Sequence, residues 1–208
     1  MLNGENFLWV EKYRPTKVAD TVLPYELKTV FQQFVDQSNV PNLILSGGPG
    51  VGKTTIAKAM LNQLDSDFIV INGSLSGNID TLRNDIMQFA SSVSFSGGRK
   101  YVILDEADYM TPNAQAALRN IMETFSKHTR FILTCNYVEK IIDPIQSRCQ
   151  VFGITPPNKS NVALRLNNIC KEESVKVELD SIRTIVNSTY PDIRRGINGL
   201  QRQVVDGR

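Results

Sequence analysis

The chain has 208 residues, a formal net charge of +2, 41% hydrophobic residues and 21% charged residues. This length suits one medium-sized domain, or one with a small second domain. The single histidine, His128, excludes a multi-histidine metal site, and Cys135, Cys149 and Cys170 lie too far apart for a CxxC pair. The apolar runs are far shorter than the ~20 residues of a membrane span, so no segment is expected to cross a membrane.

The N-terminal residues and the cysteines also bear on localisation. The first ten residues contain Glu5 and no basic start before an apolar stretch, and the three cysteines are unclustered. Both features argue against secretion. We therefore expect a cytoplasmic protein, and the small net charge neither supports nor excludes binding to DNA.

In chain order, helical and strand-like patterns alternate. A helical face is predicted over residues 26–37, and further helices over 53–64, 79–93 and 112–125, the last with Thr111 as N-cap and Pro112 at its first position. Short apolar runs predict buried strands at 43–45, 68–71, 101–104, 131–133 and 151–154. This alternation predicts an α/β fold with a mostly parallel five-stranded sheet flanked by helices.

Pro156-Pro157 follows the last predicted strand and cannot continue it, so we place a domain boundary there. Residues 1–155 are expected to form the first domain, and residues 156–208 a small helical one. The apolar faces expected in that second domain are Val162, Leu166, Ile169, Cys170; Leu179, Ile182, Ile185, Val186; and Ile193, Ile197, Leu200, Val204. So short a segment cannot bury much core alone and should pack on the first domain.

Gly47-Gly48-Pro49-Gly50-Val51-Gly52-Lys53-Thr54 carries the strongest functional signal. It fits the phosphate-binding pattern G-x-x-x-x-G-K-[ST] between a predicted strand and a predicted helix. Backbone N–H groups of such a loop surround a phosphate, while the lysine neutralises β and γ oxygens and the threonine ligates Mg²⁺. The residues expected to bind the nucleotide here are Gly50, Val51, Gly52, Lys53, Thr54 and Thr55.

Two further predicted strands end in polar residues. Asp105 and Glu106 follow Tyr101–Leu104, at the sheet edge where ligands bind. Asp105 is expected to hold Mg²⁺ together with Thr54, and Glu106 to deprotonate the attacking water. Asn136, after the third such strand, suits a γ-phosphate sensor because its amide both donates and accepts hydrogen bonds. Because the run 68–71 intervenes, the strands before Lys53 and Asp105 need not be neighbours, and a strand inserted between them is plausible.

Taken together, these motifs closely resemble AAA+ sliding-clamp loader ATPases, the replication factor C small-subunit family. The resemblance rests on Trp9-Val10-Glu11-Lys12-Tyr13-Arg14-Pro15, the phosphate loop, Asp105-Glu106-Ala107-Asp108, Asn136, Ser147-Arg148-Cys149 and Pro191-Asp192-Ile193-Arg194-Arg195. Details such as Val22-Leu23-Pro24 look like the large subunit of the T4-type phage loader. The resemblance to clamp loaders covers about residues 8–205 and implies an AAA+ domain followed by a helical lid.

The resemblance implies further site residues. Val10, Glu11, Lys12, Tyr13 and Val22 match the segment that wraps the adenine. Arg148 matches an arginine finger given in trans to a neighbouring subunit's ATP. Arg194 matches the second sensor, which reaches the γ-phosphate in cis, and Arg195 is the competing candidate.

For DNA, the resemblance implies that Gln115 and Arg119 link the ATP site to the duplex, and the helix start near Asn78 could present N–H groups to a phosphate. Solvated charge is an equally good interpretation of Arg119. Family members carry a third, collar domain that holds five subunits together. The sequence stops at Arg208, before any collar, so we expect either that the chain is a truncated or natural variant or that its assembly differs.

The expected function is a Mg²⁺-dependent ATPase motor subunit of a clamp loader in DNA replication. Its expected partners are other loader subunits in a pentameric, ring-like hetero-oligomer, a sliding clamp and primer–template DNA, without a membrane, in the host cytoplasm if phage-encoded. The alternatives are another AAA+ DNA-remodelling ATPase, such as a helicase or helicase loader, and a nucleotide-binding scaffold. A DEAD-box helicase is set aside because the strand before Thr134-Cys135-Asn136 lacks a Ser-Ala-Thr type ending.

Overall fold

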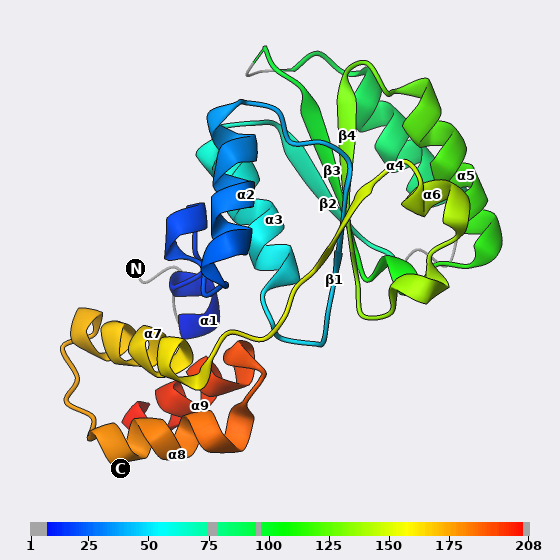
Figure 1. Cartoon of the computed structure of the whole chain (residues 1–208). Coiled ribbons are helices and arrows are strands. Elements are labelled where there is room, and N and C mark those ends of the chain that lie inside the picture. Colours follow the sequence, from blue (N-terminus) through cyan, green and yellow to red (C-terminus); the bar gives the residue numbers. More distant parts are fainter. Residues whose placement is uncertain (1–7, 75–78, 95–96, 206–208) are drawn as a thin grey trace.

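The computed structural model describes residues 8–74, 79–94 and 97–205 (Figure 1). Its centre is a five-stranded sheet in the order β2-β3-β4-β1-β5. The strands are β1 (Leu43–Ser46), β2 (Phe68–Asn72), β3 (Lys100–Asp105), β4 (Thr129–Cys135) and β5 (Gln150–Gly153), and every pairing is parallel. The predicted parallel sheet is confirmed, and so is the inserted strand, because β4 separates β1 from β3.

Burial differs between the central and edge strands. The side chains of Leu43, Ile44 and Leu45 in β1 are fully buried, as are those at the centres of β3 and β4. The prediction of buried strands is wrong for both edges, since Val70 of β2 is 41% exposed and Val151 of β5 is 46% exposed. An edge strand has a neighbour on one side only, so helices and strands cover it less completely.

Two layers of helices cover the sheet (Figure 1). On one face pack α2 (Tyr25–Asp36) and α3 (Lys53–Gln63), with the short η2 (Val18–Asp20). On the other face pack α4 (Ile79–Ser91), α5 (Pro112–Thr124) and α6 (Asp143–Gln146). Thr111 caps α5, its hydroxyl accepting from the Ala114 N–H, as predicted. Two further short helices, η3 (Ala107–Tyr109) and η4 (Val138–Lys140), follow β3 and β4.

The C-terminal helices α7 (Lys159–Glu172), α8 (Leu179–Thr189) and α9 (Ile193–Val205) form a separate bundle, here called the lid. Their apolar faces meet in a core of their own, which includes Leu166, Ile182 and Leu200. Trp9 and Tyr13, on and directly after α1 (Trp9–Lys12), belong to this same core. The N-terminal arm, residues 9–15, therefore packs with the lid although it lies far away in sequence.

For two of the residues predicted to lie on buried apolar faces, the prediction is wrong. Val93 follows the end of α4 and is 87% exposed, and Leu179, at the first position of α8, is 64% exposed. Both residues lie at or just beyond a helix end, where the helix no longer packs against a neighbouring element. The predicted division at residue 155 stays a prediction, with β5 ending at Gly153 and α7 beginning at Lys159. Among the described residues, no helix has the length and apolar character that a membrane span needs.

Candidate nucleotide-binding site

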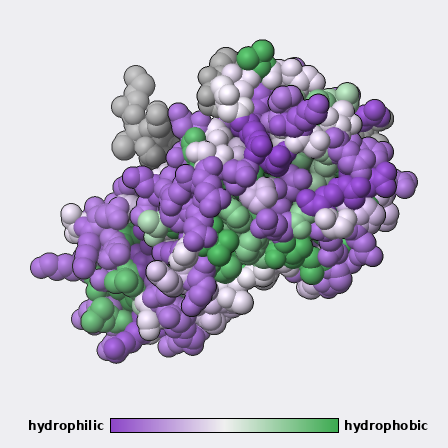
Figure 2. Space-filling model, turned by 45° about the horizontal axis from the view of Figure 1, so that its top comes forward, coloured by the Kyte–Doolittle hydropathy of each residue, from purple (hydrophilic) through white to green (hydrophobic). Residues whose placement is uncertain are grey.

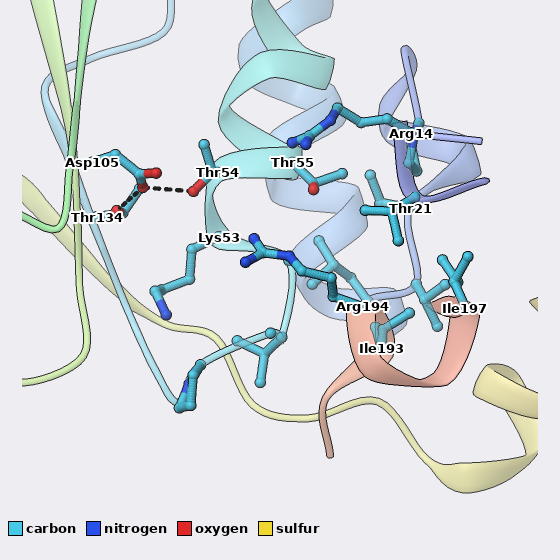
Figure 3. Close-up of a pocket in the computed structure, with 18 of the residues that line it drawn as sticks. Arg14, Thr21, Lys53, Thr54, Thr55, Asp105, Thr134, Ile193, Arg194 and Ile197 are labelled. Atoms are coloured by element: carbon cyan, nitrogen blue, oxygen red, sulfur yellow. Dashed lines mark hydrogen bonds between the residues drawn. The ribbon is translucent and has the colours of Figure 1, made fainter. Parts of the chain in front are cut away.

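A pocket lies at the carboxyl edge of the sheet, between the phosphate loop, the N-terminal arm and the lid (Figure 3). Its lining joins segments from both ends of the chain. The lining residues among those predicted from sequence are Val10, Tyr13, Val22, Gly50, Val51, Gly52, Lys53, Thr54, Thr55, Asp105, Glu106, Asn136 and Arg194. The structure thus brings most of the predicted nucleotide site together.

The phosphate loop leads from β1 into α3, as its pattern predicts. Gly50 and Gly52 have φ angles of 72° and 100°, which side chains other than glycine rarely adopt. Gly52 is the N-cap of α3, so the first N–H groups of that helix have no partner within the helix. These donors, with the positive end of the helix dipole, make the loop suited to an anion such as a phosphate.

Lys53 is held inside the loop. Its Nζ donates to the carbonyl oxygens of Gly47 and Gly48 at 2.8 and 2.7 Å, and to Oδ1 of Asn136 at 3.0 Å. Burial lowers the pKa of Lys53, and the nearby Asp105 and Asp108 carboxylates partly offset that effect. The lysine and the predicted sensor, Asn136, therefore meet at one point, where a γ-phosphate could replace the loop carbonyls.

Thr54 and Asp105 also meet. The Thr54 hydroxyl donates to Oδ1 of Asp105 at 2.6 Å, and the hydroxyl of Thr134 donates to the same oxygen (Figure 3). A hydroxyl and a carboxylate are hard oxygen ligands, and Mg²⁺ in phosphate sites typically has one or two such ligands plus water and phosphate oxygens. These residues fit Mg²⁺, whereas the described residues hold no cluster of three or more His, Cys, Asp or Glu suited to an all-protein metal site.

Glu106 has an unusual backbone. Its φ and ψ are 55° and 43°, in the left-handed region, and its N–H donates to the Thr134 hydroxyl at 3.1 Å. A residue other than glycine in that region carries strain, which concentrates at functional sites. The side chain is exposed at the pocket, where a carboxylate has room to accept a proton from water.

Of the residues predicted to wrap the adenine, the structure brings some to the pocket and leaves others outside its lining. Val10, Tyr13 and Val22 line the pocket, but Glu11 and Lys12 do not. Glu11 pairs with Arg14, and Lys12 pairs with Glu173 of the lid at 2.7 Å. Because α1 is a single helical turn, only one of its faces can meet the pocket, and these two charged side chains lie on its exposed side.

The lid closes the pocket through the start of α9. Ile193 donates its N–H to the Gly50 carbonyl at 3.2 Å, and a Cβ on Gly50 would lie 2.1 Å from Oδ1 of Asp192. Figure 3 shows Arg194 extending from α9 toward the first turn of α3. Arg194 lines the pocket and Arg195 does not, which favours Arg194 as the second sensor.

Three other predicted residues lie outside the pocket. Arg148 follows α6, where its guanidinium donates to the Pro144 carbonyl at 2.6 Å and pairs with Glu123 of α5. Gln115 is buried and bridges the Met110 and Lys140 carbonyls and the Ile142 N–H at 3.2, 2.9 and 2.8 Å. The side chain of Arg119 is 40% exposed and donates to Asn120.

Asn78, the proposed phosphate contact, lies outside the described residues. No expectation about it is tested by the structure.

Several lining residues were not predicted to belong to the site: Arg14, Pro15, Thr21, Leu23, Pro49, Asp108, Thr134, Cys135, Arg165, Ile193 and Ile197. Thr134 could have been found, because it precedes Asn136 at the end of the same strand. Arg165 carries no local signal. It lies on α7 and donates to the Tyr13 carbonyl at 2.6 Å, a contact between residues 152 positions apart.

The strand order and the phosphate loop define the class of protein: a P-loop nucleotide-binding fold with an extra strand between β1 and β3 and a helical lid. The family model described as "ATPase family associated with various cellular activities (AAA)" matches residues 43–156, more than half of the chain. The chain belongs to this AAA family.

Similar proteins agree with this assignment. The chain is 43% identical over 98% of its length to the replication factor C small subunit of Sulfurisphaera tokodaii, and 43% identical over 95% to that of Archaeoglobus fulgidus. It is 41% identical over 95% to replication factor C subunit 5 of Mus musculus. The chain spans 64%, 64% and 60% of these relatives. The resemblance to replication factor C small subunits is confirmed, and the T4-type comparison stays a prediction.

Among solved structures, Thermotoga maritima RuvB, a Holliday junction branch migration motor, matches with a TM-score of 0.76 at 18% identity, covering 93% of this chain and 65% of that one. A mutant of the same protein gives a TM-score of 0.77 at 16% identity, covering 94% of this chain and 66% of that one. At these identities the likeness extends to the fold alone. It confirms the predicted AAA+ architecture.

Proposed function

We propose that the chain is an ATP-hydrolysing motor subunit of a DNA sliding-clamp loader. Its partners would be other loader subunits in a ring-like, pentameric hetero-oligomer, a sliding clamp and primer–template DNA. In this proposal the ATP-bound ring opens the clamp and grips DNA, and hydrolysis releases both. The similarity to replication factor C small subunits supports this choice over other DNA-remodelling ATPases.

The pocket residues divide the chemistry among themselves. The phosphate-loop N–H groups and Lys53 bind the phosphates, and Val10, Tyr13 and Val22 cover the base. Thr54 and Asp105 would hold Mg²⁺, which when bound neutralises charge on the β- and γ-phosphates. Glu106 accepts the proton of the attacking water, and Asn136 orients that water against the γ-phosphate.

Two arginines complete the proposed site from different directions. Arg194 comes from the lid in cis, so its contact with the γ-phosphate would report whether the lid is closed. Arg148 lies outside this chain's own pocket, paired with Glu123. In the assembly it would exchange that partner for a neighbour's γ-phosphate, where an arginine finger contributes ~10³–10⁵-fold in rate.

One observation carries the proposal: the hydrogen-bonded pairs Lys53–Asn136 and Thr54–Asp105 line one pocket under a lid that supplies Arg194. This arrangement is organised for turnover as well as binding, which favours a motor over a scaffold.

The test is ATP hydrolysis with candidate clamp, loader partner and primer–template DNA, added singly and together. We expect stimulation that needs clamp and DNA and is lost in Arg148→Ala. Arg183→Ala is the matched control, because Arg183 also pairs with a carboxylate at the surface, Asp180, at 2.9 Å. Mixing Arg148→Ala with Lys53→Ala should restore turnover, since an intact pocket then meets an intact finger on its neighbour.

The alternatives give different results. A nucleotide-binding scaffold would bind ATP with turnover indifferent to every partner. A different DNA-remodelling ATPase would respond to DNA without the clamp. A finger acting in cis would leave the mixture of the two variants as inactive as either alone.

A further inference from the structure

Asp108 is a buried carboxylate to which the proposed reaction gives no task. It lies in η3, three residues after Asp105, with 7% of its surface exposed, and it lines the nucleotide pocket. A carboxylate at this depth is retained only where hydrogen bonds or opposite charge offset its loss of hydration.

Its hydrogen bonds go to the loop that carries the sensor. Oδ2 of Asp108 accepts the N–H groups of Asn136 and Tyr137 at 3.1 and 3.3 Å. These are the first residues after β4, where the backbone leaves the sheet and no strand pairing holds it. Asp108 thus anchors the backbone from which the Asn136 side chain extends.

The other end of Asn136 contacts the phosphate site. Its Oδ1 accepts from Lys53 Nζ at 3.0 Å. The Asp108 carboxylate, the backbone of Asn136 and the Asn136 side chain therefore connect η3 to the phosphate loop. Oδ1 of Asp108 is buried and has no hydrogen-bond partner among the described residues. Both N–H donors therefore bond to Oδ2, and the described part of the chain leaves Oδ1 unsatisfied. An unsatisfied buried oxygen costs free energy, so the position of this carboxylate favours the backbone after β4 over its own hydrogen bonding.

We propose that Asp108 is a positioning residue for the sensor: its carboxylate fixes the Asn136 backbone so that the amide meets the γ-phosphate during hydrolysis. The inference rests on the proposed function, in which Asn136 acts on ATP. Asp108 itself touches neither the water nor the phosphate, and it acts through Asn136.

Three variants separate positioning from general structure. Asp108→Ala removes both hydrogen bonds. Asp108→Asn keeps an oxygen that can accept them, with its NH₂ group in the place of the unsatisfied oxygen. Thr111→Ala is the matched control, since Thr111 also accepts one nearby backbone N–H, that of Ala114 at 3.2 Å, without contacting the sensor loop.

The first readout needs no nucleotide. Amide hydrogen exchange at Asn136 and Tyr137 should be at least about tenfold faster in Asp108→Ala, and near wild type in Asp108→Asn and Thr111→Ala. Unchanged exchange in a folded Asp108→Ala protein would overturn the anchoring, whatever the protein does with ATP.

The second readout is ATP turnover. Asp108→Ala should lower kcat roughly 10- to 100-fold with KM little changed, and Asp108→Asn should restore most of it. In an Asn136→Ala background, Asp108→Ala should cost little more, because both changes remove the same contact. Equal losses in both backgrounds, or an Asp108→Asn variant as slow as Asp108→Ala, would contradict positioning. A wild-type protein without ATPase activity would instead count against the proposed function.

Discussion

The phosphate side and the base side of the pocket are built in different ways. Apart from Arg194 of the lid, the phosphate side consists of strand ends and one loop of a single sheet, with Lys53, Thr54, Asp105 and Asn136 each within a few residues of a buried strand or a helix start. The base side is assembled from the N-terminal arm, the strap at residues 21–23 and two lid helices.

Because of this difference, we expect the phosphate side to be rigid and the base side to move. The sheet edge is fixed by the pairings of the buried strands β1, β3 and β4, so we expect its backbone to keep its position when the ligand leaves. The arm packs in the core of the lid, where the Trp9 N–H donates to Gln201 of α9 at 2.9 Å. We therefore expect the arm to move with the lid, and the base pocket to open whenever the lid does.

Figure 2 shows a mainly hydrophilic surface with hydrophobic residues gathered in smaller areas. The largest apolar side chains of the arm and many of those of the lid are buried in the core that these two segments share.

The largest expected effect is on the phosphate side, where Glu106→Gln removes the proposed base. Turnover should fall ~10²–10⁴-fold, because general base catalysis contributes on that order. ATP affinity and stability should change little, since the side chain is exposed and its replacement has the same size. Steady-state kinetics and ATP titration measure these, with Glu139→Gln, on the exposed η4, as the control. Turnover at the wild-type rate would remove Glu106 from the mechanism.

On the base side, Trp9→Ala should act through stability. Trp9 is 8% exposed in the lid core, and its ring centroid lies 6.2 Å from that of Tyr13 in an edge-to-face contact. Truncating a buried tryptophan costs about 3–5 kcal/mol. Chemical denaturation should show this loss, and ATP affinity should fall with it. Leu8→Ala is the control, because Leu8 is 54% exposed. A stable Trp9→Ala protein with weak ATP binding would mean that the arm serves the base alone.

The same difference explains what could be predicted from the sequence. The phosphate loop and Asp105-Glu106 could be predicted because their local patterns, a glycine-rich turn and a carboxylate pair after a buried strand, have few other interpretations. Asn136 alone has a weaker pattern, since an Asn after a strand is more often a turn former, and its prediction depended on the other motifs. The sheet was predicted for the same reason as the phosphate loop, since apolar runs separated by helical faces leave few topologies.

The rest depends on contacts between distant segments. Arg165 donates to the carbonyl of Tyr13, which lies 152 positions away in the sequence, and no local pattern on α7 predicts that contact. The resemblance assigns a whole segment to the adenine, whereas a single helical turn presents only some of its residues to the pocket, and Glu11 and Lys12 lie outside the lining. The edge strands were predicted to be buried because a short apolar run does not reveal its place in a sheet.

The close approach of Asp192 to Gly50 is one of the contacts that join the two sides, and a substitution there tests their independence. Gly50→Ala would force a Cβ to 2.1 Å from Oδ1 of Asp192, at a φ of 72° that alanine rarely adopts. Asp192 cannot move freely, because that oxygen accepts the Arg195 N–H at 3.0 Å. We expect a loss of about 1–3 kcal/mol in unfolding free energy and a displaced lid.

Gly48→Ala is the matched control in the same loop, since a Cβ there would meet nothing within 4 Å in the protein. Denaturation of both variants, and of Gly50→Ala combined with Asp192→Ala, separates the clash from the backbone strain. If Gly50→Ala costs as much without the Asp192 carboxylate as with it, the contact does not couple the loop to the lid.

The smallest expected effect concerns the pH dependence of the contact between arm and lid. Hydrogen bonds from Lys12 and then Tyr13, the latter at 2.6 Å, lower the pKa of Glu173 below its ordinary value of 4.5. A carboxylate whose pKa is lower in the folded state stabilises the fold above its unfolded pKa, and this contribution is lost as the pH falls through the folded value. Glu173→Gln removes the charge while keeping an oxygen that can accept from Tyr13.

Because the ion pair of Lys12 and Glu173 lies at the protein surface, the effect on stability should be slight and salt-sensitive. Thermal unfolding between about pH 3 and pH 7 should show a smaller loss on acidification for Glu173→Gln than for wild type, with Glu172→Gln as the neighbouring control. ATP turnover should be unchanged at neutral pH, because the sheet edge holds the reacting groups without this contact. A large loss of turnover would mean that this contact sets the position of the lid, and of Arg194, for the reaction, and the two sides would then act as one unit.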